Sequence, residues 1–466
     1  MMEGTLSQAA QILRGTLHGG DNPFSGVSTD TRTLSAGELF FALRGPNYDG
    51  EEFIGRAAAA RAAGAVACDA INGQLPVIRV ENTRRALGTL AAEWRRRMPA
   101  TVIGLTGSNG KTTLKELIAA CLSRAAPTLA TRGNLNNDIG VPLMLSELEP
   151  RHRFAVIEMG ANHAGEIAYL TSLAMPGIVV ITNAAPAHLE GFGDIESVAR
   201  AKGEILQGEH RPDWAILNAD DRFFTYWKRL TAGKTATFGF AVGADFRALD
   251  VTTTARGSNF ILASEQIPGR NKKLEITLPL AGRHNVVHAC AAAAVASVLG
   301  IDGDLIRRGL ESATPVSGRL QPLSGIGGAY VYDDSYNANP ASVTAAAQFI
   351  ANCAGEGGGE GWLVLGDMRE LGNDAEELHR TVGDEARKAG VRRLFATGPL
   401  SRLTVESFGS NAVWYENTDQ LVRELVAELE RNASRGINVL VKGSRSMQME
   451  RVVHALHAGA VQSRGN

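Results

Sequence analysis

Short apolar runs alternate with longer amphipathic segments along most of the chain. Four of these runs read as buried strands, each followed by polar or helical sequence, at 100–106, 154–159, 178–182 and 214–218. Buried strands that alternate with helices are typical of a parallel sheet covered by helices on both faces. The same alternation restarts in the last third of the chain, at 330–335, 362–367, 393–398 and 437–443. The pattern therefore predicts an α/β protein.

Changes in this pattern divide the chain into three predicted domains. Residues 1–98 combine short strands and turns with helices, and the tract RRRMP at 95–99 reads as a linker. Residues 99–314 hold the first alternation, then alternating sequence at 236–280 that predicts an antiparallel insertion or edge. Residues 315–466 hold the second alternation, which predicts a Rossmann-like C-terminal domain. A chain of 466 residues also exceeds what one hydrophobic core usually serves.

The strongest chemical signal is the segment GSNGKTT at 107–113, between the first buried strand and a helical pattern. A glycine-rich turn in this context binds phosphates, because backbone N–H groups and the helix dipole face them. Lys111 would reach the terminal phosphates of ATP, and Thr112 would offer its hydroxyl to Mg²⁺. Leu105 takes the first glycine position of the general P-loop pattern, which argues against an ordinary nucleotide kinase or GTPase. The predicted nucleotide-binding loop comprises Gly107, Ser108, Asn109, Gly110, Lys111, Thr112 and Thr113.

Two further polar residues follow strands that should neighbour this loop. Glu158 ends the run at 154–159, and His188 lies just past the run at 178–182. The carboxyl ends of parallel strands meet at one edge of a sheet, so both side chains can converge on the phosphates. Taken singly, each also has a simpler interpretation, as a charge at a strand end and a loop histidine. Lys202 lies in a helical pattern, where a lysine is usually solvated, and residue chemistry alone assigns it no role.

Composition narrows the possible partners. The formal net charge is −2, so we expect neither nucleic-acid nor polybasic membrane binding. The N-terminal sequence has no basic start or cleavage site of a signal peptide, and the Ala-rich stretch at 288–300 is shorter than the ~20 residues of a spanning helix. Four scattered cysteines fit a reducing compartment. We expect a cytoplasmic monomer without membrane insertion.

Ten motifs in order resemble the Mur ligases over nearly the whole chain. They are GSNGKTT at 107, GNLNNDIGVPL at 133, IEMGANHAGEI at 157, TNAAPAHLEGFG at 182, AKGEIL at 201, AGRHNVVHA at 281, SGRLQ at 317, DDSYNANP at 333, LVLGDMRELG at 363 and VKGSRSM at 441. EMGANHAGEI and DDSYNANP resemble most the members that join D-alanyl-D-alanine to UDP-N-acetylmuramoyl-tripeptide. The resemblance implies a three-domain fold with a central P-loop ATPase domain, and a role in peptidoglycan precursor synthesis.

The resemblance also implies a mechanism. The γ-phosphate of ATP would activate the tripeptide carboxylate as an acyl phosphate, which the dipeptide amine would then attack, releasing phosphate. Lys202 falls where these ligases carry a carbamylated lysine, which turns a cation into an oxygen ligand for a hard metal. Thr112 and Glu158 would hold one Mg²⁺, and His188 with carbamylated Lys202 a second. Lys111, Lys202 and His188 are thus the implied catalytic residues.

Other positions match binding residues of the family. Asn285 corresponds to a residue on the adenine side, and Arg319 and Asp334 to residues at the γ-phosphate region and ribose, with Tyr336 and Asn337 beside them. The implied C-terminal domain therefore closes on ATP. For substrates, the matching positions are Ser28, Thr29, Asp30 and Arg32 for the uridine diphosphate, Asn137, and Lys442, Ser444 and Arg445 for an anionic substrate such as the dipeptide. Ser, Thr and Asp in series are also ordinary turn residues.

Two alternatives stay open. One is a sister amide ligase, either an amino-acid-adding Mur ligase or a folylpolyglutamate synthetase, which a panel of amino-acid acceptors would distinguish. The other is a P-loop switch that hydrolyses ATP without ligation, and would therefore release phosphate with no carboxylate acceptor.

Overall fold

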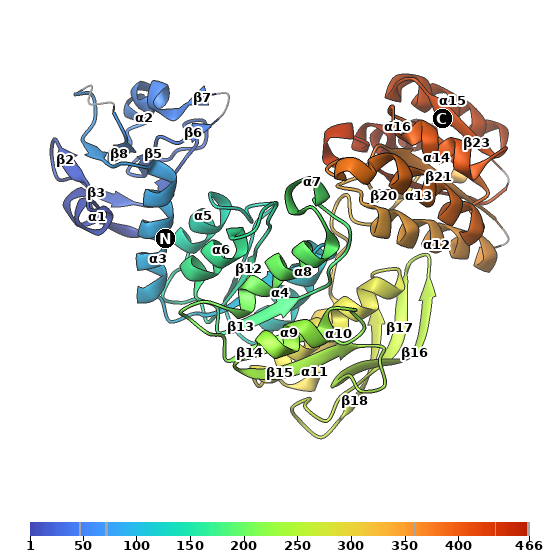
Figure 1. Cartoon of the computed structure of the whole chain (residues 1–466), viewed down its shortest axis with the longest axis horizontal. Helices are drawn as coiled ribbons and strands as arrows, with labels where there is room; N and C mark the ends of the chain where they lie inside the picture. Colours follow the sequence, from blue (N-terminus) through green and yellow to red (C-terminus); the bar gives the residue numbers. More distant parts are fainter. Residues whose placement is uncertain (46–47, 70–72, 358, 434, 464–466) are drawn as a thin grey trace.

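The computed structural model describes residues 1–466 except 46–47, 70–72, 358, 434 and 464–466. Three units follow one another along the chain, with the N-terminal unit and the C-terminal unit at opposite ends of the molecule and the central unit between them (Figure 1). Within the described part of the chain, no helix is long and apolar enough to cross a membrane. The observed architecture is the α/β type that the alternation predicts.

The N-terminal unit is built on a five-stranded sheet. Its order is β2 (Thr16–His18), β9 (Val77–Arg79), β8 (Gly64–Ala67), β5 (Leu39–Phe41) and β4 (Val27–Ser28), parallel except for the β2–β9 pair. Helices α1 (Leu6–Leu13), α2 (Ile54–Ala59) and α3 (Thr83–Arg97) accompany it, with the 3₁₀ turn η1 (Gly50–Phe53). Two small ribbons complete the unit, β1 (Glu3–Thr5) with β3 (Pro23–Ser25) and β6 (Arg44–Gly45) with β7 (Tyr48–Asp49).

Helix α3 corrects one prediction. The arginines of the RRRMP tract are not a linker; Arg95, Arg96 and Arg97 form the last turn of α3. Arginine is a good helix former, and cations in a last turn are stabilised by the helix dipole. The helix packs against α5 (Gly140–Ser146) and α6 (Glu166–Ala174) of the central unit, and the Trp94 indole donates to the Leu148 carbonyl at 3.0 Å. The two units therefore share one hydrophobic core.

The central unit holds a nine-stranded sheet. Its order is β11 (Thr128–Ala130), β12 (Phe154–Glu158), β10 (Thr101–Thr106), β13 (Ile178–Ile181), β14 (Trp214–Asn218), β15 (Lys234–Gly239), β16 (Phe246–Thr254), β17 (Gly257–Ala263) and β18 (Lys273–Leu278). Only β16–β17–β18 pair in antiparallel fashion. The segment at 236–280 was predicted to be antiparallel throughout; in fact β15 and the start of β16 continue the parallel sheet. Polar and apolar residues alternate in β15, which is typical of an antiparallel strand with one exposed face. The strand is nevertheless buried over most of its length, where it pairs with β14.

Helices cover both faces of this sheet. They are α4 (Lys111–Ser123), α5, α6, α7 (Leu189–Phe192), α8 (Ile195–Gly203), α9 (Phe224–Leu230), α10 (Arg283–Val298) and α11 (Gly303–Glu311), with the 3₁₀ turn η2 (Glu204–Leu206). The Ala-rich segment forms a buried helix, α10, whose small side chains pack against α4 and the sheet. Residues that leave the strands at their carboxyl ends lie together at one edge.

The C-terminal unit contains a six-stranded sheet of order β19 (Gln321–Ser324), β20 (Tyr330–Asp334), β24 (Ile437–Lys442), β21 (Glu360–Gly366), β22 (Arg393–Thr397) and β23 (Ala412–Tyr415). All pairs except β19–β20 are parallel. Its helices are α12 (Pro340–Gly357), α13 (Ala375–Ala389), α14 (Ser401–Phe408), α15 (Thr418–Arg431) and α16 (Glu450–Ser463), with η3 (Ile326–Gly328), η4 (Gly372–Asp374) and η5 (Arg445–Met447).

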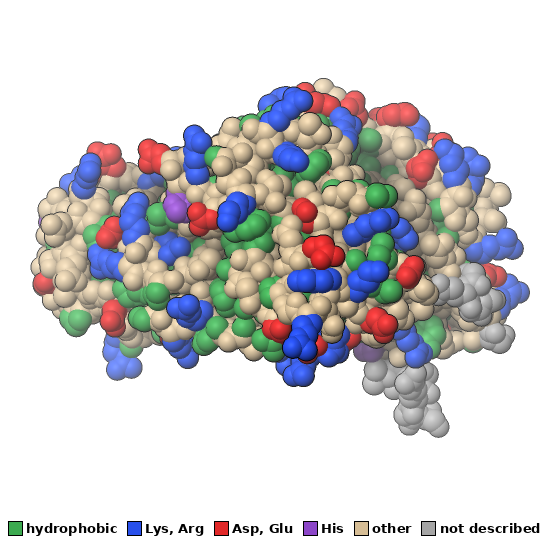
Figure 2. Space-filling model, turned by 90° about the horizontal axis from the view of Figure 1, so that it is seen from below, with side chains coloured by type: hydrophobic (Ala, Val, Ile, Leu, Met, Phe, Trp, Pro, Cys, Tyr) green, Lys and Arg blue, Asp and Glu red, His purple; other side chains and the backbone are tan. Residues whose placement is uncertain are grey.

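Figure 2 shows the molecule from below, and there Lys and Arg side chains are interspersed with Asp and Glu. The mixture on this face matches the nearly balanced charge of the chain. Concentrated polar chemistry is found instead in a cavity between the units.

Candidate active site

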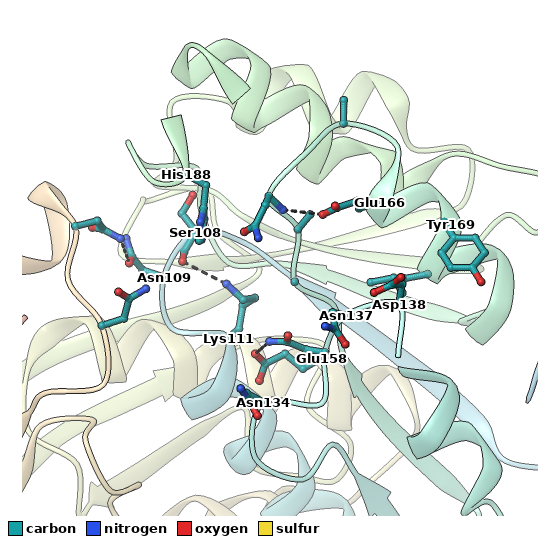
Figure 3. A pocket seen from close by; sticks show the side chains of 18 of the residues that line it. Ser108, Asn109, Lys111, Asn134, Asn137, Asp138, Glu158, Glu166, Tyr169 and His188 are labelled. Carbon is teal, nitrogen blue, oxygen red and sulfur yellow. Dashed lines mark hydrogen bonds between the residues drawn. The ribbon is translucent and has the colours of Figure 1, made fainter. Parts of the chain in front are cut away.

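A cavity of about 860 Å³ opens where the three units meet. The central unit contributes the P-loop and the segments after β11, β12 and β13, while the N-terminal unit contributes the start of α3 and the C-terminal unit the segments around β20 and β24. In Figure 3, Lys111 lies between Ser108 and Glu158, with Asp138 and Tyr169 farther along the cavity. Among the predicted site residues, those that line it are Ser108, Asn109, Gly110, Lys111, Asn137, Glu158, His188, Arg319, Tyr336, Asn337 and Lys442.

Packing requires glycine at two positions of the P-loop. Gly107 has φ +148°, and a Cβ there would lie 1.8 Å from the hydroxyl oxygen of Thr182. Gly110 has φ +78° and caps the start of α4, and a Cβ there would lie 2.1 Å from the imidazole of His288. Both conformations favour glycine, and both contacts exclude a side chain. The loop is therefore held tightly against β13 and α10, with the N-terminus of α4 beside the cavity.

Lys111 folds back over this loop. Its Nζ donates to the Gly107 carbonyl at 2.7 Å and to the Ser108 carbonyl at 3.3 Å. Burial lowers the pKa of Lys111, Glu158 opposes that change, and the guanidinium of Arg319 adds to it. A lysine held between a carboxylate and a guanidinium is well placed to exchange its carbonyl partners for phosphate oxygens.

Glu158 lies next to the loop because of strand register. It is the last residue of β12 and pairs with Leu105 of β10, so its carboxylate emerges beside the start of the P-loop. Its Oε1 accepts from the Asn136 amide at 2.8 Å. Its Oε2 is buried, and within the described residues it has no hydrogen-bond partner. A carboxyl oxygen left without a partner in a buried site is costly, and a cation would satisfy it.

The donor set therefore fits a divalent cation. The free Oε2 of Glu158 and the Thr112 hydroxyl at the start of α4 are hard oxygen donors, which Mg²⁺ prefers. The described residues include no group of three or more His, Cys, Asp or Glu side chains that could by themselves hold a metal ion. This is expected for a site that also uses a hydroxyl, a modified lysine and substrate phosphates.

Lys202 differs from a solvated helix lysine. Its residue is only 1% exposed, at the buried end of α8, and its ammonium lies 5.4 Å from the centre of the Phe192 ring. Burial, together with the charge of Lys111, lowers the pKa of Lys202 to about 7. Lys202 does not line the cavity itself. The simple interpretation of a solvated helix face is wrong.

The C-terminal unit reaches the P-loop through several contacts. The Arg319 guanidinium lies 3.4 Å from the Thr112 hydroxyl and 4.1 Å from the centre of the Tyr336 ring. The Asn339 amide donates to Asn109 Oδ1 at 2.7 Å, which joins residues 230 positions apart. These contacts bring segments of the C-terminal unit directly against the P-loop.

Lys442 is paired with a predicted ribose-side residue. Its Nζ donates to Asp334 Oδ2 at 2.7 Å and to the Asn337 carbonyl at 2.9 Å. The pair results from the parallel register of β20 and β24, in which Asp334 lies opposite Lys442. The ammonium of Lys442 is therefore already bonded to the Asp334 carboxylate. A bound substrate would have to interact with this ammonium alongside Asp334.

Several predicted residues lie outside the cavity. Ser28, Thr29, Asp30 and Arg32 lie at and beyond the end of β4 in the N-terminal unit. There the Arg32 guanidinium donates through Nε and Nη2 to the Asp30 carboxylate and holds the pKa of that carboxyl at about 2. Asn285 is buried within α10, and its amide donates to the Ala281 carbonyl. In the C-terminal unit, Ser444 is buried and accepts from the Arg369 backbone, and Arg445 pairs with Glu450. Gly107, Thr112, Thr113 and Asp334 adjoin the cavity without lining it.

The structure adds residues that sequence reasoning missed. Asn136 holds Glu158, Asn339 contacts the P-loop, and His288 packs beneath Gly110. At the far end of the cavity, Arg84 of α3 pairs with Asp138 at 3.1 Å. Asn136 adjoins the predicted Asn137, which instead uses its side-chain oxygen to accept from the Ile139 and Gly140 amides. The motif sequences contained most of these residues, but only tertiary contacts show what each one does.

Three stretches match models of one protein family. Residues 23–95 match "Mur ligase family, catalytic domain", residues 105–296 match "Mur ligase middle domain" and residues 318–445 match "Mur ligase, glutamate ligase domain".

Full-length relatives agree with these matches. The UDP-N-acetylmuramoyl-tripeptide–D-alanyl-D-alanine ligase of Escherichia coli is 42% identical, with 98% of this chain and 99% of the relative covered. The ligase of the same name from Bacillus subtilis is 34% identical at similar coverage, 98% and 99%.

Solved structures of related proteins share the architecture. A crystal structure of MurF from Acinetobacter baumannii has a TM-score of 0.91 at 33% identity, covering 98% of this chain and 99% of that one. MurF from Thermotoga maritima, solved in complex with ADP, has a TM-score of 0.80 at 24% identity, covering 94% and 98%, and supports the fold.

Proposed function

Because the chain belongs to the Mur ligase family, we propose that it ligates D-alanyl-D-alanine to the terminal carboxylate of UDP-N-acetylmuramoyl-tripeptide, at the expense of ATP. Relatives that carry this activity in their names match nearly the whole chain. The observation that carries the proposal is the single cavity that unites the P-loop with residues of all three units. Such a cavity can bring the phosphates of ATP, the peptide end of a long nucleotide-linked substrate and an acceptor to one place.

The reaction we propose proceeds in two steps. The tripeptide carboxylate attacks the γ-phosphorus of ATP, which breaks the bond to ADP and forms an acyl phosphate. The dipeptide amine then attacks the acyl carbon, loses a proton and displaces inorganic phosphate. The protein's part is to position reactants and to stabilise charge on the transferred phosphoryl group. Lys111 serves this purpose from the P-loop, and Arg319 from the C-terminal unit.

Two divalent cations complete the proposed site. Thr112 and Glu158 would hold one, and His188 with carbamylated Lys202 the other. When bound, Mg²⁺ would neutralise the phosphate oxygens. The buried, unpaired Oε2 of Glu158 supports the first assignment.

Burial of Lys202 supports the carbamate. With its pKa lowered to about 7, a large share of the amine is neutral near neutral pH. A neutral amine can attack the carbon of CO₂ and lose a proton, which leaves an anionic N-carboxylate. The modified side chain would then supply oxygen ligands from a position that is buried and close to Lys111.

The substrate ends are assigned by position. Ser28, Thr29, Asp30 and Arg32 would bind the uridine diphosphate in the N-terminal unit, and Asn137 the substrate where it enters the cavity. Asn285 would lie on the adenine side of ATP, and Asp334, Tyr336 and Asn337 near its ribose and phosphates. Lys442, Ser444 and Arg445 would meet the dipeptide. Their locations at the two sides of the cavity support a substrate that extends from the first unit to the third.

A phosphate-release assay with each substrate omitted in turn tests the proposal. We expect sustained release only with ATP, the UDP-linked tripeptide and D-alanyl-D-alanine together, and a pentapeptide product by mass spectrometry. Sustained release without the tripeptide would instead identify an ATP-hydrolysing switch. Product formation with single amino acids, but not with the dipeptide, would identify a sister ligase.

A further inference from the structure

The predicted metal ligand His188 is contacted from another unit. The carboxylate of Glu370, in the C-terminal unit, lies directly against Nδ1 of His188. The two segments also share a backbone hydrogen bond, in which the Glu190 amide donates to the Glu370 carbonyl at 3.2 Å. A Cβ on Gly372 would lie 3.7 Å from the backbone of Glu190, so the two segments are in close contact. The segment 367–372 therefore packs directly on α7.

Both partners are held in uncommon backbone conformations. His188 has φ +55° and Glu370 has φ +62°, in the left-handed region that non-glycine residues rarely adopt. The backbone carbonyl of His188 accepts hydrogen bonds from the Gly191 and Phe192 amides. The first turn of α7 therefore fixes the backbone of His188. Residues that keep such a conformation are held there by their surroundings, commonly at functional sites.

Segment 367–372 is itself firmly anchored in the C-terminal unit. Asp367 is fully buried and accepts from both the backbone and the hydroxyl of Ser401 at 2.8 Å. The Met368 amide donates to the imidazole of His379 at 3.1 Å, and the Arg369 amide to the Ser444 hydroxyl at 2.8 Å. These hydrogen bonds fix segment 367–372 to the rest of the C-terminal unit. The position of Glu370 is therefore set by the position of that unit.

The chemistry of metal-bound histidines suggests a role for the contact between Glu370 and His188. A histidine that ligates a metal through one ring nitrogen usually donates its other N–H to a carboxylate, which fixes the ring orientation. Here Glu370 faces Nδ1, and Nε2 remains the nitrogen available to a cation. In the described residues Nδ1 is buried and has no hydrogen bond of regular geometry, so the Glu370 carboxylate is its nearby polar group.

We propose that Glu370 is a positioning residue for His188, and that the second cation site is complete only when the C-terminal unit is docked on the P-loop. The inference rests on the proposed function, which assigns His188 as a ligand. It links docking of the C-terminal unit to assembly of the cation site, because the carboxylate that orients the ligand belongs to that unit. An open enzyme would then bind the second cation weakly.

Mn²⁺ binding measured by electron paramagnetic resonance tests this, on the full-length protein with a non-hydrolysable ATP analogue and the UDP-linked tripeptide. We expect two bound Mn²⁺ in the wild type. Glu370→Ala should weaken the second about 10- to 100-fold and leave the first unchanged. Glu376→Ala, which removes an exposed carboxylate of the same unit that pairs with Arg380, is the matched control and should change neither.

A double-mutant cycle separates positioning from independent binding. If Glu370 acts through His188, adding Glu370→Ala to His188→Ala should weaken Mn²⁺ binding no further. Unchanged binding in Glu370→Ala, or a further loss in the double variant, would overturn the inference. Small-angle scattering of Glu370→Ala in the same complex should give the wild-type radius of gyration; a more open molecule would mean that Glu370 holds the units together instead.

Mn²⁺ binding by the wild type and by His188→Ala shows whether a failure concerns the role of Glu370 or the ligase proposal. Should the wild type bind one Mn²⁺ only, or His188→Ala bind both normally, His188 is not a ligand and the inference fails with that assignment. The ligase activity itself is decided independently, by substrate-dependent phosphate release and the pentapeptide product.

Discussion

At the scale of single residues, burial decides what a polar side chain can do. Lys111 and Lys202 both lie in helices, α4 and α8. Lys202 is buried and does not line the cavity, whereas Lys111 does. Glu158 owes its importance to one oxygen that none of the described residues satisfies. Two predictions belong to this scale.

The first concerns Lys202. We expect Lys202→Ala to lose at least ~10²-fold in turnover, the scale of losing one preorganised charge contact. Acetate added to the assay should restore part of the rate, because it supplies carboxylate oxygens in place of the carbamate. Lys228→Ala, an exposed lysine in α9, is the control and should stay active. A nearly active Lys202→Ala without an acetate response would exclude the carbamate.

The second concerns the N-terminal unit. Arg32 is exposed and engaged only with Asp30 in the described structure, so its removal should leave the fold intact. We expect Arg32→Ala to raise KM for the UDP-linked substrate about 10-fold or more, with KM for ATP unchanged, because a ground-state contact is lost. Steady-state kinetics with each substrate varied measure this, with Arg56→Ala of the same unit as control. Equal effects on both KM values would remove Arg32 from the site.

At the scale of elements, α10 supports the P-loop from below. His284 and His288 lie one turn apart on this buried helix, with ring centres 6.2 Å apart, and the ring of His288 packs against Gly110. Burial lowers the pKa of His288 to about 3, and the nearby His284 contributes. The helix that seats the loop therefore carries two neutral imidazoles.

Acid should weaken this support. An unfolded chain binds a proton on His288 as pH falls below about 6.5, while the folded chain does not until about pH 3. The unfolding free energy should thus fall by up to about 1.4 kcal/mol per pH unit in that window from this residue, and remain independent of it at higher pH. Native-state hydrogen exchange of α10 amides between pH 7 and 5 measures the slope. His288→Asn should reduce it, while the exposed control His210→Asn should not.

At the scale of the whole molecule, the site exists only where the units meet. The C-terminal unit brings Arg319 and Asn339 to the P-loop and Glu370 to His188. Helix α3, by contrast, ties the N-terminal unit to the central unit through a shared hydrophobic core. Domain boundaries after residues 98 and 314 stay predictions, and α3 shows that packing across the first of them is extensive.

Arg319 offers a prediction about this assembly. Its guanidinium stacks on Tyr336 and reaches Thr112, so Arg319→Ala should raise KM for ATP about 10- to 100-fold. Arg319→Lys should also be impaired, because an ammonium does not reproduce the planar stack. Arg402→Ala removes a comparable arginine beside Trp414 elsewhere in the same unit and is the control. Normal ATP kinetics in Arg319→Ala would show that the interdomain contact is not part of the nucleotide site.

The sequence by itself determined the type of fold and the phosphate site. Alternation of buried strands and helices is a local pattern, and the P-loop is a contiguous strand, turn and helix, so both can be recognised without knowing what packs against them. Even where local patterns misled, as at RRRMP and β15, the error concerned the extent or partner of one element. The family motifs located the candidate residues in the same way, because each motif is local.

Only the tertiary structure decided which of these residues meet, and in what state. Burial of Lys202, the unsatisfied oxygen of Glu158 and the pairing of Asp334 with Lys442 depend on neighbours distant in sequence. The contact of Glu370 with His188 joins two units, and neither segment alone indicates it. Desolvation and charge proximity are properties of three-dimensional arrangement, and for this reason the chemistry of these residues could not be read from their positions along the chain.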